Sequence, residues 1–185
     1  MMILITGGSG SGKSAYGEER ILSLPGKKRV YLATMIPWDE ECKNKIARHR
    51  LMRAEKSFET IEKYRDIQEV SIPEHSTVLL ECLSNLTANE MFGSGNRGQK
   101  EAEAYGETRK KTPEAVGEKI ADGVKKINSL ADNLVVITNE VFSDGTEYDE
   151  ETERYRKALG RANCILSEVA DEVVEVVWGI PVKLK

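Results

Sequence analysis

The amino-acid sequence predicts an α/β domain in which a mostly parallel sheet lies between two layers of helices. Short apolar runs alternate with longer amphipathic stretches along the 185 residues, which is the order of repeated strand–helix units. The apolar runs are almost continuous, as in strands that are covered on both faces. The composition, 39% hydrophobic and 31% charged, is that of an ordinary globular protein. We therefore expect one domain over residues 1–185.

The apolar runs place the predicted strands. Residues 1–6 form the first, and residues 29–34 form a second after a Pro25-Gly26 turn. Two more strands are predicted at 77–81 and 134–138. Near the end of the chain, residues 172–178 and 182–184 flank a Gly179-Ile180-Pro181 turn, which predicts a terminal hairpin.

Four helices are predicted between these strands, at 14–24, 39–56, 113–130 and 149–170. Thr112 and Pro113 give the third a capping side chain and a favourable first residue. Apolar residues recur every three or four positions in the last two helices, at Val116, Ile120, Val124, Ile127 and Leu130 and at Tyr155, Leu159, Ala162, Leu166 and Val169. Residues 93–111 are almost all polar and predict a solvated insertion, with a lid or a subunit contact as alternatives.

The strongest motif is a phosphate-binding loop between the first strand and the first helix. It fits G-x-x-x-x-G-K-[ST] at every position, with Gly7, Gly8, Ser9, Gly10, Ser11, Gly12, Lys13 and Ser14. Glycines let successive backbone N–H groups turn towards phosphate oxygens, and the following helix points its positive end at the same anion. We expect Lys13 to reach the β- and γ-phosphates of a nucleoside triphosphate and the Ser14 hydroxyl to ligate Mg²⁺.

The Mg²⁺ ion also needs an acidic partner at the end of a neighbouring strand. Glu81 ends the run Val78-Leu79-Leu80-Glu81 and is the preferred candidate, while Glu140, just after the strand at 134–138, is the alternative. Carboxyl ends of parallel strands face the crevice where ligands of α/β proteins bind. Ser14 and Glu81 are therefore the predicted metal ligands.

Other features narrow the class of protein. A net charge of −4 argues against general affinity for nucleic acid. No apolar stretch reaches the roughly 20 residues of a membrane span, and the start of the chain does not resemble a signal peptide, so we expect a cytoplasmic protein. Cys42, Cys82 and Cys164 are too scattered for a disulfide framework or a zinc site. No Asn-Lys-x-Asp guanine-reading motif is present, and helicases and ABC-type motors are usually larger and carry further motifs. These exclusions leave a P-loop protein of small-molecule kinase size.

The helix predicted at 39–56 carries a basic stripe. Lys45, His49 and Arg53 are spaced four residues apart and share one helical face. Such a face suits a triphosphate, and a neutral imidazole within it is a candidate nucleophile for attack on phosphorus. The alternative is an ordinary solvated face. The only other histidine, His75, lies in a polar turn and is the weaker candidate.

Several segments together resemble the bifunctional adenosylcobinamide kinase / adenosylcobinamide-phosphate guanylyltransferase family of cobalamin biosynthesis. The likeness spans nearly the whole chain. The matching segments are residues 1–14, Tyr31-Leu32-Ala33-Thr34, residues 45–50 with Arg53, residues 58–62, Leu79-Leu80-Glu81-Cys82, Thr138-Asn139-Glu140-Val141, Gly160-Arg161-Ala162-Asn163, residues 170–173 and residues 179–183. The chain departs from the usual family residues at Lys45, Phe58 and Phe142.

The resemblance implies a RecA-like fold, a homotrimer and two reactions on a corrinoid. ATP or GTP first phosphorylates adenosylcobinamide, and GTP then guanylylates a histidine, which passes GMP to the phosphorylated corrinoid. By position, His49 is the implied nucleophile, with Lys13 as the second catalytic residue. The implied nucleotide-binding residues beyond the loop are Ala33, Thr34, Met35, Arg50, Leu51, Met52, Arg53, Glu62 and Glu81.

Two alternatives to this bifunctional enzyme remain at the level of sequence. One is a monofunctional small-molecule P-loop kinase in which His49 is only a residue of a basic face. The other is a nucleotide-dependent binding switch with little turnover. Transfer of phosphate to an acceptor separates the switch from both enzymes, and a covalent nucleotidyl adduct separates the two enzymes from each other.

Overall fold

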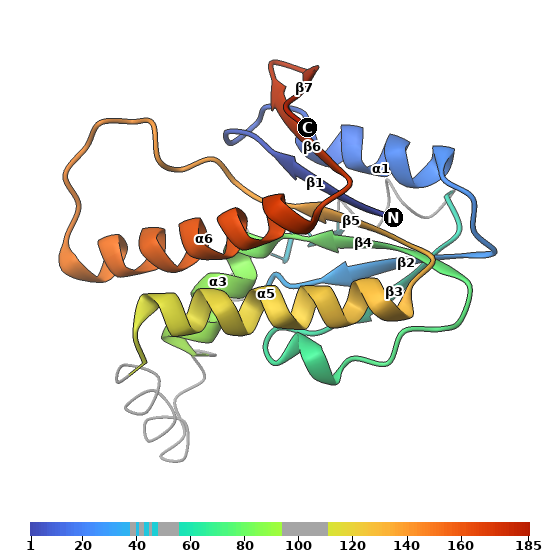
Figure 1. Cartoon of the computed structure of the whole chain (residues 1–185), viewed down its shortest axis with the longest axis horizontal. Helices are drawn as coiled ribbons and strands as arrows, with labels where there is room; N and C mark the ends of the chain where they lie inside the picture. The colour runs from blue at the N-terminus through green and yellow to red at the C-terminus, as the bar shows by residue number, and fades with distance from the viewer. Residues whose placement is uncertain (38–39, 41–42, 45, 48–55, 94–110) are drawn as a thin grey trace.

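A computed structural model describes residues 1–37, 40, 43–44, 46–47, 56–93 and 111–185. In this part of the chain a seven-stranded sheet has the order β3-β2-β4-β5-β1-β6-β7 (Figure 1). The strands are β1 (Met2–Thr6), β2 (Lys28–Ala33), β3 (Phe58–Glu62), β4 (Ser76–Glu81), β5 (Asn133–Ile137), β6 (Glu172–Val177) and β7 (Ile180–Lys183). All neighbouring strands pair in parallel except β6 and β7, which form the predicted antiparallel hairpin.

Helices cover both faces of this sheet, as Figure 1 shows. Helix α1 (Lys13–Ser23) packs on one face against β1, β4, β5 and β6. On the opposite face lie α3 (Leu83–Phe92), α5 (Pro113–Leu130) and α6 (Glu150–Val169), and α5 and α6 pack against each other. A 3₁₀ turn, η1 (Ile67–Glu69), contacts α5. The predicted three-layer, RecA-like α/β fold is therefore confirmed.

Two hydrophobic cores explain the continuous apolar strands. In β1, Ile3 and Ile5 belong to the core shared with Ile21 of α1, whereas Met2 and Leu4 belong to the core beneath α3, α5 and α6. The same alternation between cores runs through β4 and β5. Because successive side chains of a strand point to opposite faces, a strand buried on both sides needs an apolar residue at nearly every position.

Most predicted elements agree with the structure to within two residues, and Thr112 caps α5 by accepting a hydrogen bond from the Ala115 backbone N–H at 3.2 Å. Among the apolar residues that recur along α5 and α6, Leu130 and Val169 are 47% and 50% exposed, because each ends its helix as the chain leaves for the next strand. Of the helix predicted over 39–56, residues 40, 43–44 and 46–47 are helical, and the others, apart from residue 56, lie outside the described residues. Most of the insertion predicted at 93–111 also lies outside them.

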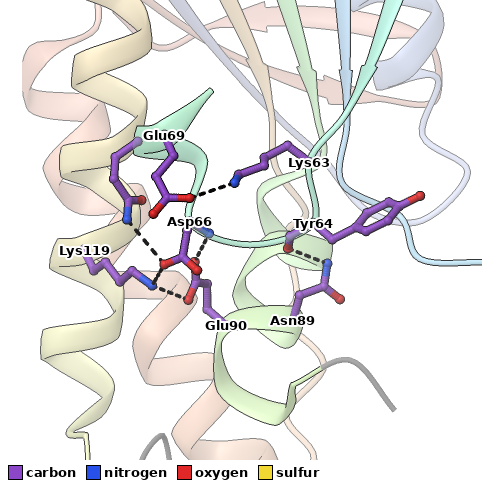
Figure 2. Close-up of polar contacts among 8 residues, drawn as sticks. Lys63, Tyr64, Asp66, Glu69, Asn89, Glu90 and Lys119 are labelled. Atoms are coloured by element: carbon purple, nitrogen blue, oxygen red, sulfur yellow. Dashed lines mark hydrogen bonds and ion pairs between the residues drawn. The ribbon is translucent and has the colours of Figure 1, made fainter. Parts of the chain in front are cut away.

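A charged cluster fastens the segment after β3 to helices α3 and α5 (Figure 2). The Lys119 ammonium donates to Asp66 Oδ1 at 2.5 Å and to Glu90 Oε2 at 2.6 Å. Glu90 is only 4% exposed, so its carboxylate depends on these partners. Burial alone would lower the pKa of Lys119, but the two hydrogen bonds outweigh it and raise that pKa. The hydrogen bond from Lys119 also lowers the pKa of Asp66.

We expect Lys119→Met to destabilise the protein by about 3 kcal/mol in urea unfolding, because it leaves the buried Glu90 carboxylate without its counter-charge. Lys125→Met is the matched control on the same helix. Its ammonium lies 3.2 Å from Asp122 on the surface, and losing this exposed pair should cost less than about 0.5 kcal/mol. Adding Glu90→Gln to Lys119→Met should recover much of the loss. Equal effects of the two lysine substitutions would contradict the assignment of the cluster as a buried ion pair.

Candidate functional site

The glycine loop between β1 and α1 folds back on itself at the carboxyl edge of the sheet. The Ser11 backbone N–H donates to the Gly8 carbonyl at 3.2 Å, and Gly12 adopts a left-handed φ of 93° just before α1 begins. Gly7 is enclosed: a Cβ there would lie 2.6 Å from both the Val176 carbonyl oxygen and Ser11 Oγ. The terminal hairpin also supports the loop, since the Gly179 N–H donates to the Ser11 carbonyl at 2.7 Å. The loop is therefore held from β1, α1 and β6–β7 together.

Lys13 is the first residue of α1 and lies almost entirely within this loop. It is 8% exposed, and its ammonium donates to the Gly8 carbonyl at 2.9 Å. The lysine thus brings a positive charge into the concavity that the loop backbone forms. An anion bound there would meet this charge together with the positive end of the α1 dipole.

A hydroxyl and a carboxylate meet beside the lysine. The Ser14 hydroxyl donates to Glu81 Oε1, which brings together two residues 67 positions apart in sequence. The Tyr31 hydroxyl donates to Glu81 Oε2 at 2.9 Å, so both carboxylate oxygens of Glu81 have hydrogen-bond donors. Strands β2 and β4 are neighbours in the sheet, and this pairing places the tyrosine beside the glutamate.

The alternative carboxylate, Glu140, points elsewhere. Its Oε1 accepts from the Phe142 N–H at 2.7 Å and from the Ser143 hydroxyl at 3.0 Å within its own loop. Glu140 lines a separate hollow between that loop and α6, not the cavity beside Lys13. The geometry therefore favours Glu81 over Glu140 as the acidic partner of Ser14.

A cavity of about 290 Å³ opens beside the loop, and predicted residues from four separate segments line it. These are Ser9, Gly10, Lys13, Ser14, Ala33, Met35, Glu62 and Glu81. They come from the glycine loop with the start of α1, the end of β2 with the residues after it, the end of β3 and the end of β4. Their role in nucleotide binding stays a prediction, but the fold brings them to one place.

Thr34 lies behind this cavity wall. It is fully buried, and its hydroxyl donates to the Cys82 carbonyl and accepts from the Cys82 N–H, both at 2.8 Å. The Thr34 N–H donates to the Glu81 carbonyl at 3.1 Å. Through these hydrogen bonds, Thr34 positions the backbone of Glu81 and Cys82. The remaining predicted residues, His49, Arg50, Leu51, Met52 and Arg53, lie outside the described residues.

Sequence reasoning missed several residues that line the cavity, namely Tyr31, Ile46, Thr60, Cys82, Asn85, Ile137 and Asn139. Asn139 donates to the Ser84 hydroxyl at 2.6 Å, and that hydroxyl lies 3.0 Å from the Cys82 sulfur. Burial raises the pKa of the Cys82 thiol, which keeps it protonated and unreactive. Cys82 and Asn139 each lie one or two residues after the end of a parallel strand. Ligands of α/β proteins bind at such strand ends, so this position could have identified both residues from the sequence.

A loop with this backbone, lysine and helix is built to hold the phosphates of a nucleotide, so fold and site together define a P-loop nucleotide-binding protein. Within the described residues, no helix is long and apolar enough to cross a membrane. Over residues 3–184 the sequence matches the family described as cobinamide kinase / cobinamide phosphate guanyltransferase. The chain belongs to this family and is an enzyme of its kinase and nucleotidyltransferase type.

Two relatives match along their whole length. The bifunctional adenosylcobalamin biosynthesis protein CobU of Escherichia coli (strain K12) is 31% identical over 188 aligned positions, covering 100% of both chains. The protein of the same name from Salmonella typhimurium (strain LT2) is 30% identical, with the same coverage. The crystal structure of flagellar accessory protein FlaH from Methanocaldococcus jannaschii aligns with 100% of this chain and 77% of its own, at 14% identity and a TM-score of 0.49. That likeness is too slight to add to the fold assignment.

Proposed function

We propose that the chain phosphorylates adenosylcobinamide with ATP or GTP and then transfers GMP from GTP to the product through a guanylylated His49. Family membership over nearly the whole chain supports the two activities. The observation that carries the chemistry is the meeting of Lys13, Ser14 and Glu81 at one cavity. The proposed products are adenosylcobinamide phosphate and then adenosylcobinamide-GDP.

The first step is a phosphoryl transfer. A hydroxyl oxygen of the corrinoid attacks the γ-phosphorus and releases its proton to solvent, the new O–P bond forms, the bond to the β–γ bridging oxygen breaks, and the nucleoside diphosphate leaves. Such transfers depend mainly on positioning and on neutralising phosphate charge. The buried Lys13 ammonium and the N–H groups of the glycine loop supply both.

The second step transfers GMP. A neutral imidazole nitrogen of His49 attacks the α-phosphorus of GTP, a P–N bond forms, and pyrophosphate leaves. A phosphate oxygen of the phosphorylated corrinoid then attacks the same phosphorus, the P–N bond breaks, and the histidine is regenerated. Arg50, Leu51, Met52 and Arg53 are proposed to bind the nucleotide beside His49, together with Ala33, Thr34, Met35 and Glu62.

Mg²⁺ is the proposed metal, and the residues present suit it. The Ser14 hydroxyl and the Glu81 carboxylate offer hard oxygen ligands within hydrogen-bond reach of each other. Mg²⁺ usually binds proteins through one or two such groups and completes its shell with water and substrate phosphates. When bound, the ion would neutralise charge that develops on the phosphates.

We also propose a homotrimer. The terminal hairpin and the residue after it expose large apolar side chains, which include Trp178 at 90%, Ile180 at 63% and Leu184 at 59%. Exposed apolar clusters of this kind commonly mark protein contacts. Strand β7 is also at the edge of the sheet. Burial of this edge in an assembly would protect it from unwanted strand pairing.

Intact-protein mass spectrometry after mixing with GTP and Mg²⁺ tests the covalent step. We expect a mass gain equal to one GMP, which is labile in acid and disappears when phosphorylated corrinoid is added. Corrinoid phosphorylation without any adduct would instead indicate the monofunctional kinase. Nucleotide binding without either reaction would indicate a binding switch.

A further inference from the structure

We propose that Tyr64 is a positioning residue that aims the Glu62 carboxylate at hydrogen-bond donors of the bound nucleoside, and that Asn89 holds Tyr64 in place. This inference rests on the proposed binding of nucleotides in the cavity. It assigns a role to a contact next to the cavity, between the last residue of β3 and the segment that follows it.

The contact itself is direct. Glu62 lines the cavity from the end of β3, and the Tyr64 hydroxyl donates to Glu62 Oε2 at 2.8 Å. Glu62 is exposed, and the hydrogen bond from Tyr64 restricts the orientations that its flexible side chain can sample. A carboxylate can accept several hydrogen bonds, so the bond from Tyr64 orients Glu62 while it remains able to accept others.

Asn89 fixes the backbone that carries the tyrosine. Its side-chain N–H₂ group donates to the Tyr64 carbonyl at 3.0 Å (Figure 2). The same group donates to the Thr34 carbonyl at 2.8 Å, and Asn89 is 5% exposed. The amide therefore ties the segment after β3 to the segment after β2. The next residue, Glu90, accepts from the Asp66 N–H at 2.7 Å, which gives α3 a second hold on the same segment.

Helix α3 thus places both carboxylates of the cavity. It begins two residues after Glu81, at the end of β4, and it reaches Glu62 through Asn89 and Tyr64. Lys119 secures this end of α3 through its contacts with Glu90 and Asp66. Helix α3 is consequently connected to both acidic groups, to Glu81 along the chain and to Glu62 through two hydrogen bonds.

The sheet order indicates what Glu62 contacts. The Ser14 hydroxyl beside Lys13 contacts Glu81 of β4, and β3 with Glu62 lies two positions further along the sheet, roughly 10 Å at the usual spacing between strands. A phosphate cradled beside Lys13 would lie nearer to Glu81 than to Glu62 and has the same sign of charge as Glu62, so Glu62 does not suit the phosphates. Met35 and Ile46 provide apolar side chains in the same cavity, which suits a base. The donors left for the carboxylate are ribose hydroxyls or base N–H groups.

A double-mutant cycle on GTP affinity tests the coupling between the two residues. Tyr64→Phe should weaken GTP binding about three- to tenfold by calorimetry, without a change in melting temperature. The double variant with Glu62→Gln should bind no more weakly than Glu62→Gln alone, because the tyrosine acts only through the carboxylate. Tyr148→Phe is the matched control: its hydroxyl also donates to a carboxylate, that of Asp144, but away from this cavity, and GTP affinity should not change.

Three analogues identify the donor: 2′-deoxy-GTP, 3′-deoxy-GTP and inosine triphosphate, which lacks the base amino group. For each analogue, its affinity is compared with that of GTP on the natural protein and on Glu62→Gln. An analogue that binds the natural protein more weakly than GTP does, but binds Glu62→Gln as tightly as GTP does, lacks the group that Glu62 contacts. The inference would be overturned if the effects of Tyr64→Phe and Glu62→Gln on GTP affinity were additive. It would also be overturned if Glu62→Gln still bound all three analogues more weakly than GTP. Absence of GTP binding to the natural protein would instead refute the proposed function.

Discussion

His49→Ala should abolish the acid-labile GMP adduct and the formation of adenosylcobinamide-GDP, while phosphorylation of adenosylcobinamide continues. The imidazole supplies the nucleophile only for the guanylyl step, and alanine offers no atom that can form the P–N bond. The γ-phosphate transfer relies on the glycine loop and Lys13. The prediction is checked by intact mass after incubation with GTP and by chromatography of the corrinoid products.

The chain offers a matched control for this experiment, because His75 is its only other histidine. His75 lies in a turn before β4, and its Nδ1 is 3.6 Å from Asp132 on the protein surface. His75→Ala should keep the full adduct. An adduct of unchanged amount in His49→Ala, or its loss in His75→Ala alone, would show that His49 is not the nucleophile.

The sequence predicted best those strands that are buried on both faces of the sheet, because such burial requires a continuous run of apolar residues. Strands β1, β4 and β5 bury nearly all their residues in the two cores, so their apolar runs are unbroken. The glycine loop was predictable for a different reason: its glycines and Lys13 answer a chemical requirement that few other sequences meet. Both kinds of signal are local and need no knowledge of distant contacts.

The elements that sequence reasoning missed lack such signals. Strand β3 is a five-residue edge strand with three exposed positions, so it has no apolar run. Helix α3 is buried almost all round, and its buried side chains include the polar Thr87, Asn89 and Glu90, so no apolar stripe distinguishes it. Thr87 donates to the Leu83 carbonyl within the helix, but the partners of Asn89 and Glu90, such as the Thr34 carbonyl for Asn89, lie 24 or more residues away along the chain. Only tertiary contacts explain these residues.

The candidate site shows the same division. Ser14 and Glu81 were predicted as partners from motif and strand end, and their side chains are hydrogen-bonded in the structure. Tyr31, which donates to the other oxygen of Glu81, was not predicted as a site residue, because a tyrosine within an apolar strand is usually a core residue. Parallel pairing of β2 with β4 is what brings it to the carboxylate.

Lys13→Ala should reduce both phosphorylation of the corrinoid and formation of the GMP adduct by about 10²- to 10³-fold, the usual effect of removing one preorganised donor from a phosphate site. The lysine ammonium is buried in the only P-loop motif of the sequence, and both reactions require a triphosphate to be held there. Lys126→Ala, on the exposed face of α5, is the control and should leave both rates unchanged. Rates of both reactions are measured on the same preparation, with melting temperature as the check on folding.

The pattern of loss decides whether one loop serves both reactions. Parallel loss of the two rates requires the triphosphate of each step to occupy the same loop, because a single side chain then supports both. Loss of phosphorylation with an intact adduct would contradict the prediction and place the GTP that guanylylates His49 at a second phosphate site. Lys13, Glu81 and Glu62 line the same cavity, and its volume of about 290 Å³ is at the lower limit for a small-molecule pocket. A pocket of this size favours successive use by the two triphosphates over simultaneous occupancy.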